Sequence, residues 1–270
     1  MEGIRISNKE YRQRPGISSS ELKKIMITPA HYKHWKDNPQ EDTPSLLFGR
    51  AAHKYILETY DFYTEFAVAP NVDRRTKEGK EEWARFVADS EGKDVITQEQ
   101  FEQIDAMRTA AYATPFVSKL LSGEKELSFW GVDEETGLEI KARPDCITEW
   151  NGKNILIDYK TAQDVENTKF CRDSIKFGYD LQLAFYLDIL RQNTGKDYMV
   201  VIIAQEKTAP YVTNVFQLSE NYLENGRNLY KEMLKVYKEC LDTDTWYGYM
   251  KNGISILGEP DDEDMEEGDE

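Results

Sequence analysis

The sequence is poor in cysteine and has no long apolar run. Its three cysteines, Cys146, Cys171 and Cys240, lie far apart, and no C-x-x-C motif occurs. This spacing argues against a zinc knuckle and a disulfide framework. No stretch approaches the roughly 18 apolar residues of a membrane helix, and the opening MEGIRISNKEYRQR has no apolar core of a secretory signal. We therefore expect no membrane partner and a cytoplasmic location.

An excess of positive charge is also missing, because the net charge of the 270 residues is −16. This disfavours nonspecific coating of DNA, which requires a basic footprint. The last stretch, GEPDDEDMEEGDE, holds nine acidic and no basic residues, so residues 1–257 carry only −7. A local basic groove, and therefore a nuclease, remains compatible with this composition. The acidic stretch 258–270 is expected to be a disordered tail, which could mimic nucleic acid, contact a partner or simply increase solubility.

Local patterns predict helices, then a meander of strands, then a helix, two strands and a last helix. Ser18 with Glu21 fits a capping box, Pro29 breaks that helical segment, and 70–80 is a polar loop before a helix from Glu81 to Ala88. Further helices are expected at 44–60, 97–122, 179–193 and 219–241, and strands at 126–132, 138–145, 147–150, 153–161, 197–206 and 211–218. The order predicts an α/β fold with a mixed central sheet flanked by helices. We expect one domain over 1–257, in which residues 1–122 are helical and residues 123–257 form the catalytic core.

The stretch RPDCITEWNGKNILIDYKTA, residues 143–162, contains a strong hairpin signal. Asn151-Gly152 between apolar runs predicts a two-residue type I′ turn. This register places Asp145 directly opposite Asp158, with Cβ atoms about 4.5–5.5 Å apart, where like charges are destabilising. Lys160 lies on the same face as Asp158, since side chains alternate along a strand. A divalent cation would explain why two carboxylates are held together beside a lysine.

A third carboxylate extends this row if the stretch EETG, residues 134–137, is a four-residue loop. Glu126 then pairs with Asp145, and the row Glu126, Asp145, Asp158 crosses three neighbouring strands. Mg²⁺ and Mn²⁺ prefer such oxygen ligands. Lys160 could orient the attacking water or stabilise charge in the transition state. The alternative is a hairpin whose acidic side chains are merely solvated.

Two further motifs flank the acidic residues. GRAAHKYILE places His53 four residues after Gly49 on an apolar helix, and QLAFY places Gln182 and Tyr186 on one helix face. Taken alone, His53 could be a satisfied core residue, and the Gln182–Tyr186 pair could serve packing. Their order, with the histidine before the acidic residues and the glutamine after them, is the informative feature.

GRAAHKYILE, ELSFWGVDEETGLEIKARPDCI, IDYKTA and QLAFY, in this order, resemble the PD-(D/E)-x-K nucleases of the RecB/RecE group. The likeness covers residues 15–240 and is greatest to the phage exodeoxyribonuclease VIII type. The resemblance implies a metal held by His53, Asp145, Asp158 and the Tyr159 carbonyl, and the expected ion is Mg²⁺, which Mn²⁺ can replace. Catalysis is then expected from Lys160, Asp158, Asp145 and the nearby Glu126, and Gln182 and Tyr186 would support the site or touch DNA.

Two departures from the family pattern are visible. Asp158 stands where many relatives have glutamate, which shortens the ligand and keeps its chemistry. The cysteine set of the iron–sulfur relatives is absent from the sequence, so we expect no iron–sulfur cluster.

The resemblance also implies an activity and partners. The implied activity is 5′→3′ exonuclease action on linear double-stranded DNA, which leaves 3′ overhangs. The implied assembly is a ring-shaped homo-oligomer (trimer or tetramer), and the implied partner is a RecT-like single-strand annealing protein in a bacterial host. The competing expectations are a structure-selective or CRISPR-associated endonuclease on the same core, and a non-catalytic binding or inhibitor protein.

Two segments are candidates for DNA contact. RPGISSSEL resembles the stretch that holds a 5′-phosphate in lambda-type exonucleases, which points to Arg14 and Ser20, and a helix N-terminus is a suitable anion site. The alternative is a plain helix cap. In DRRTKEGK, the residues Arg74, Arg75 and Lys77 could follow the DNA backbone, or the loop could simply be solvated.

Overall fold

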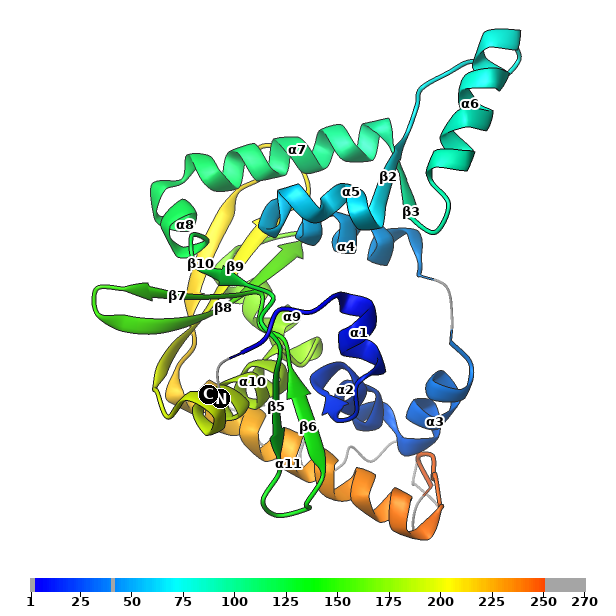
Figure 1. Ribbon diagram of the computed structural model, residues 1–270. Helices are drawn as coiled ribbons and strands as arrows, with labels where there is room; N and C mark the ends of the chain where they lie inside the picture. Colours follow the sequence, from blue (N-terminus) through cyan, green and yellow to red (C-terminus); the bar gives the residue numbers. More distant parts are fainter. Residues whose placement is uncertain (1–2, 40–41, 251–270) are drawn as a thin grey trace, which may run out of the picture.

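The computed structural model describes residues 3–39 and 42–250, so the acidic stretch 258–270 lies outside the described residues. Eleven α-helices and ten strands are assigned within these ranges (Figure 1). The helices are α1 (Asn8–Gln13), α2 (Ser19–Ile27), α3 (Pro29–Asp37), α4 (Pro44–Leu57), α5 (Phe62–Glu65), α6 (Lys77–Asp89), α7 (Gln98–Ala113), α8 (Pro115–Leu120), α9 (Asn167–Lys176), α10 (Tyr179–Thr194) and α11 (Glu220–Thr243). The strands are β1 (Ile17–Ser18), β2 (Phe66–Ala69), β3 (Asp94–Thr97), β4 (Glu124–Lys125), β5 (Phe129–Val132), β6 (Glu139–Ala142), β7 (Cys146–Trp150), β8 (Lys153–Ala162), β9 (Tyr198–Glu206) and β10 (Thr213–Gln217). Over the described ranges, no helix combines the length and the apolar character that crossing a membrane requires.

The central sheet has five strands in the order β10-β9-β8-β7-β4. β8 and β9 run parallel, whereas the other neighbours are antiparallel, so the predicted mixed sheet is confirmed. A three-stranded sheet, β1-β6-β5, and a parallel pair, β2-β3, complete the described strands.

Helices cover both faces of the central sheet (Figure 1). Leu156 of β8 packs in a core with residues of α2, α10 and α11, whereas Ile155 and Ile157 pack in a second core with residues of α4 and α7. This alternation follows from the two-residue period of a strand. Asp158 and Lys160 share the even-numbered positions of β8 and therefore belong to the face that α2 and α10 cover.

The hairpin between β7 and β8 has the predicted register, with Cys146 opposite Ile157 and Trp150 opposite Lys153. Asn151 and Gly152 both have positive φ, 50° and 73°, as a type I′ turn requires. The prediction that Asp145 adjoins Asp158 across these strands is therefore supported by the observed ladder.

The register predicted through Glu126 is also confirmed. Lys125 lies opposite Cys146, the Glu126 amide donates to the Asp145 carbonyl at 3.3 Å, and Phe129 lies opposite Ala142. The predicted strands 126–132 and 138–145 are not continuous, however. β5 begins only at Phe129 and β6 ends at Ala142, and the chain passes between these strands and the central-sheet strands β4 and β7 near Glu126 and Asp145. Glu126 has φ +54°, a left-handed conformation that costs a non-glycine residue about 1–2 kcal/mol.

Several boundaries differ from the sequence predictions. The helix expected from Glu81 begins at Lys77, because Thr76 caps it by accepting a hydrogen bond from the Gly79 amide. Pro115 divides the expected helix 97–122 into α7 and α8, and α4 ends at Leu57 rather than at residue 60. The short strands β2 and β3 and the helix α9 were not predicted. β2 and β3 are four residues each and flank the long insertion that contains α6, so no local turn signal joins them.

Two helical glycines offer a matched test of packing. A Cβ at Gly226 of α11 would lie 2.1 Å from the Asp180 carbonyl oxygen, whereas a Cβ at Gly49 of α4 would meet only Thr161 Oγ1, at 3.9 Å. We expect Gly226→Ala to lower the free energy of unfolding by about 1–3 kcal/mol, because overpacking outweighs helix propensity. Gly49→Ala should raise it by up to about 1 kcal/mol. Urea unfolding measures both, and equal signs for the two substitutions would contradict this packing.

Candidate metal and catalytic site

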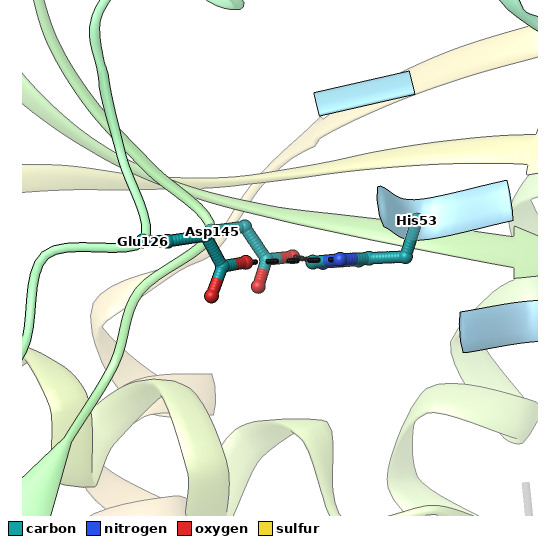
Figure 2. Close-up of side chains that lie close together, drawn as sticks. All are labelled: His53, Glu126 and Asp145. Carbon is teal, nitrogen blue, oxygen red and sulfur yellow. Dashed lines mark ion pairs between the residues drawn. The ribbon is translucent and has the colours of Figure 1, made fainter. Parts of the chain in front are cut away.

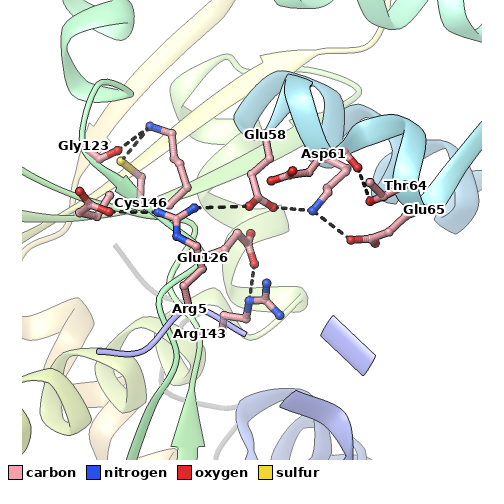
Figure 3. Close-up of polar contacts among 12 residues, drawn as sticks. Arg5, Glu58, Asp61, Thr64, Glu65, Gly123, Glu126, Arg143 and Cys146 are labelled. Atoms are coloured by element: carbon pink, nitrogen blue, oxygen red, sulfur yellow. Dashed lines mark hydrogen bonds and ion pairs between the residues drawn. The ribbon is translucent and has the colours of Figure 1, made fainter. Parts of the chain in front are cut away.

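α4 places His53 at the end of the central sheet where β4 ends and β7 begins. The next residue, Lys54, fixes this helix end, since its Nζ lies 2.8 Å from a Glu58 carboxylate oxygen and 2.9 Å from one of Glu65. Arg5 extends the network, with its guanidinium 4.0 Å from Glu58 and 3.0 Å from Glu124 (Figure 3). The network ties α4 to β4, the strand that directly precedes Glu126.

His53, Glu126 and Asp145 form a compact cluster (Figure 2). His53 Nε2 lies 3.0 Å from Asp145 Oδ2, and His53 Nδ1 lies 3.7 Å from Glu126 Oε1. Each of the three offers one ligand atom, and these atoms all lie within 4.8 Å of one another. The Tyr159 amide donates to Asp145 Oδ2 at 2.6 Å, and Arg143 Nε lies 2.7 Å from Glu126 Oε2 (Figure 3).

The charges of this cluster are strongly coupled. Burial by itself would lower the pKa of His53, but the charge and hydrogen bond of Asp145, together with Glu126, raise it to about 9. Burial and the charge of Asp145 raise the pKa of Glu126 to about 7, against the opposing effects of His53 and Arg143. The pKa of Asp145 is lowered because His53 and Lys160 outweigh its burial.

Asp158 and Lys160 form an ion pair beside this cluster, with Lys160 Nζ 2.7 Å from Asp158 Oδ2. The Gln182 side-chain amide donates to Asp158 Oδ1 at 2.9 Å. Burial raises the pKa of Asp158 despite Lys160, whereas Asp158 and Asp145 raise the pKa of Lys160 against its burial. Lys160 is therefore held as a cation.

The predicted metal-ligand set and the compact cluster overlap in His53 and Asp145. Asp158 is not a member of the group within 4.8 Å, because its two oxygens face Lys160 and Gln182, and Glu126 takes the third place. Tyr159 lines the groove that opens over the site. The Tyr159 amide, rather than its carbonyl, contacts Asp145. Which of these atoms hold an ion stays a prediction.

Lys23 and Tyr179 belong to this site and were not predicted. Lys23 Nζ donates to Gln182 Oε1 at 2.8 Å, and it lies 5.2 Å from the centre of the Tyr179 ring. Lys160 Nζ lies 4.9 Å from the same ring. An ammonium group can only donate, so Lys23 turns the Gln182 carbonyl toward itself and the amide NH₂ toward Asp158. No acidic residue lies three or four positions from Lys23 on α2, so no local signal marked it.

Lys23 should reduce stability near neutral pH. Burial and the charge of Lys160 lower its pKa from 10.5 to about 7 in the folded protein. Between about pH 7 and 10.5 the unfolded chain therefore binds more protons, and the free energy of unfolding rises with pH. We expect Lys23→Met to raise the thermal midpoint more at pH 6.5 than at pH 9.5.

Differential scanning calorimetry at the two pH values tests this expectation. The control is Lys33→Met, because the Lys33 side chain is 44% exposed and pairs with Asp37 on α3. An equal effect of Lys23→Met at both pH values would show that Lys23 keeps its ordinary pKa.

A groove of about 1480 Å³ opens over the site. Nine lysine and arginine residues and seven carboxylates line it, so its walls are net basic although the chain is acidic. Arg14, Ser20 and Tyr186 are among the lining residues. Arg14 pairs with Glu10 at 2.6 Å and lies 5.0 Å from the Trp130 ring, and Ser20 is exposed in the first turn of α2. Tyr186 is buried one turn after Gln182, and burial raises its pKa.

Arg74, Arg75 and Lys77 lie apart from this groove, around the start of α6, which extends away from the body of the molecule (Figure 1). Arg74 covers the Trp83 ring at 4.5 Å, Arg75 pairs with Asp73 at 2.8 Å, and Lys77 lies 3.9 Å from Glu81. The structure does not bring these three residues together with the predicted catalytic residues.

The donor set fits a divalent cation. One imidazole and two carboxylates converge from α4 and from the ends of β4 and β7, and like-charged Glu126 and Asp145 lie side by side. Nitrogen and oxygen donors of this kind suit Mg²⁺, Mn²⁺ and other first-row metals. His53 would have to lose its proton to bind, since only the neutral imidazole is a ligand.

The mixed sheet, the helices on both its faces and the Asp145, Asp158-x-Lys160 arrangement define the PD-(D/E)XK nuclease class. The chain belongs to the family of PDDEXK-like domains of unknown function (DUF3799), whose model matches residues 18–252. No curated protein matches the chain.

Two solved structures are similar. A protein from Eubacterium rectale, named as a candidate exonuclease, shares 18% identity at a TM-score of 0.59, covering 94% of this chain and 97% of its own. A protein named SSO0001 shares 13% identity at a TM-score of 0.32, covering 73% of this chain and 86% of its own. The similarity to the Eubacterium rectale protein supports the fold, whereas the similarity to SSO0001 is too low to support any conclusion.

Proposed function

We propose that the protein is a metal-dependent exonuclease that degrades linear double-stranded DNA from 5′ to 3′ and leaves 3′ single-stranded overhangs. The observation that carries the proposal is the gathering of His53, Glu126, Asp145, Asp158 and Lys160 at a groove with net basic walls. A basic groove in an acidic chain selects a polyanion locally. The name of the Eubacterium rectale neighbour agrees with exonuclease activity.

The side chains of the site have separable roles. A divalent ion, with Mg²⁺ as the proposed metal and Mn²⁺ as a substitute, would polarise the phosphate and lower the pKa of a bound water. Lys160, fixed as a cation by Asp158, can orient the attacking water or stabilise charge on the phosphate. Arg143 lines the groove beside Glu126, and its guanidinium is the proposed donor to a phosphate oxygen.

The finer features of the proposal rest on motif resemblance to the RecE-like, exodeoxyribonuclease VIII type. They are the 5′→3′ polarity, a ring-shaped trimer or tetramer, a RecT-like single-strand annealing partner and a role in phage-type recombination in a bacterial cytoplasm. Arg14 and Ser20, which line the groove, are the proposed contacts of the 5′-phosphate.

Digestion of end-labelled linear duplex DNA tests the proposal. The substrates carry a 5′-phosphate or a 5′-hydroxyl and are incubated with Mg²⁺ or EDTA, beside a covalently closed circle. We expect loss of the linear DNA only with metal, release of the 5′ label first, faster action on the phosphorylated end, and an intact circle. Cutting of the circle would favour the endonuclease alternative. Survival of every substrate would favour a non-catalytic binding protein.

A further inference from the structure

An aromatic ladder leads from the reaction centre to the surface. Lys160 Nζ lies 4.9 Å from the centre of the Tyr179 ring, the Tyr179 and Phe177 rings lie 5.9 Å apart at 34°, and Lys176 Nζ lies 6.0 Å from the Phe177 ring. The contacts therefore run without a gap from the catalytic lysine to a surface cation. Tyr179 lines the groove, and Phe177 lies beyond it on the connection between α9 and α10.

The outer end of the ladder is exposed although it is apolar. Phe177 is 51% exposed and Ile175 is 57% exposed. Met26 of α2 is 38% exposed and approaches the same connection, since its Cε lies 3.6 Å from where a Cβ of Gly178 would be. Exposed apolar side chains that adjoin one another commonly mark an interaction site.

The backbone holds the two rings in place. Gly178, between them, has φ +62° and is the N-cap of α10, a conformation that glycine adopts without strain. Lys23 packs against this glycine, with its Cε 3.5 Å from the position that a Cβ of Gly178 would take and its Nζ 5.2 Å from the Tyr179 ring. The ladder is thus supported by α2 and flanked by three lysines.

Adjacent aromatic rings flanked by cations match one class of ligand. Unpaired bases stack on aromatic side chains while lysines meet the phosphates, and this is the common mode of binding single-stranded nucleic acid. Bases within a duplex already stack on one another, so their faces are not free for Phe177. The continuity of the ladder with Lys160 places any such bases next to the phosphate to be cut.

We propose that Phe177 and Tyr179 form a stacking subsite for unpaired bases of the DNA strand beside the phosphodiester that is cleaved. This inference rests on the proposed nuclease function, because it locates the strand relative to Lys160. The protein would then hold the strand to be cut in single-stranded form at the reaction centre. The complementary strand would lie outside the Phe177–Tyr179 subsite.

The test pairs substitutions in the protein with substitutions in the DNA. A fluorescent oligothymidylate and the same oligomer with abasic sites are titrated with the full-length protein in EDTA, and fluorescence anisotropy reports binding. We expect Phe177→Ala to weaken binding of oligothymidylate about 5- to 100-fold, and to change binding of the abasic oligomer little. Phe177→Trp should retain binding, and Phe177→Leu, which keeps the apolar volume, should not.

Phe116→Ala is the matched control. Phe116 is 41% exposed and pairs with Trp150 at 5.1 Å near the tip of the β7–β8 hairpin, away from any lysine of the ladder. Its substitution should leave both titrations unchanged. Equal losses for the thymidylate and abasic oligomers on Phe177→Ala would overturn the stacking subsite.

Three further outcomes separate the subsite from the proposed function and from a protein contact. If the wild type cuts linear DNA and Phe177→Ala binds oligothymidylate as the wild type does, the subsite is wrong and the nuclease proposal stands. If the wild type cuts no DNA, the proposed function fails at once. If Phe177→Ala changes the oligomeric mass in light scattering and leaves oligonucleotide binding intact, the patch is a protein contact and the subsite is overturned.

Discussion

Replacing Lys160 by alanine should lower the rate of DNA cleavage by about 100- to 1,000-fold, the range found when a positioned donor is removed from a transition state. Lys160 Nζ is fixed 2.7 Å from Asp158 and faces the groove. Its charge is held by two carboxylates, Asp158 and Asp145. Initial rates on linear duplex DNA with saturating Mg²⁺ measure the effect.

Asp158→Asn should give a comparable loss with almost no change in side-chain volume. Asparagine has no charge to pair with Lys160, and its NH₂ group cannot accept a hydrogen bond. It can therefore keep only one of the two contacts that Asp158 accepts from Lys160 and Gln182. The matched controls are Asp164→Asn and Lys169→Ala, an exposed pair at 2.6 Å after the same strand, β8. The controls should cleave as the wild type does.

Retained cleavage in Lys160→Ala, with an unchanged thermal midpoint, would contradict the assignment of Lys160. Loss of cleavage together with a large fall in the midpoint would be ambiguous for alanine alone. Lys160→Arg resolves that case, because arginine keeps the charge and the pairing with Asp158 while displacing the donor. We expect Lys160→Arg to fold with a near-normal midpoint and to cleave poorly.

The carboxylate row could be predicted because turn chemistry fixes register. Asn151-Gly152 requires two positive φ values, and each residue pair then follows by simple counting from the turn. The four-residue loop before Leu138 fixed the second register in the same way, through the Asp133 amide bonded to the Leu138 carbonyl at 2.9 Å. Local rules of this kind reach across three strands because every step is a short connection.

Other features could not be predicted because they depend on distant contacts. The bend at Glu126 depends on where the chain passes from β4 of the central sheet to β5 of the three-stranded sheet, and no nearby residue indicates this point. Lys23 meets Gln182 across 159 residues of sequence, so only the packing of α2 on α10 reveals it. Gly49 is a different case, because a Cβ there would meet only Thr161 Oγ1 at 3.9 Å, so close packing does not require a glycine at this position of the motif.

His53→Ala should abolish tight binding of Mn²⁺. His53 supplies the one nitrogen in a group whose other ligand atoms are carboxylate oxygens of Glu126 and Asp145. Loss of an outer partner of a metal site typically costs 10- to 100-fold in affinity, so loss of a ligand should cost about 100-fold or more. Isothermal titration calorimetry of the metal-free protein with MnCl₂ measures it directly.

Stability gives an independent measurement of the same site. A ligand that binds only the folded state stabilises it by about 2.7 kcal/mol at a concentration of 100 times its dissociation constant. The wild type should therefore gain thermal stability on addition of Mn²⁺ and lose the gain with EDTA, whereas His53→Ala should respond to neither. His34→Ala is the control, because His34 is an exposed residue of α3 that contacts Asn38.

Comparing Glu126→Gln with Asp158→Asn distinguishes the two possible sets of metal ligands. If the ion is held by His53, Glu126 and Asp145, Glu126→Gln should weaken Mn²⁺ binding more than Asp158→Asn does. If Asp158 is a ligand, as the motif predicts, the ion must draw this carboxylate away from Lys160, and Asp158→Asn should then cause the larger loss. Unchanged Mn²⁺ binding in His53→Ala would exclude the histidine from both sets, and its pairing with Asp145 would then serve only to hold α4 against the sheet.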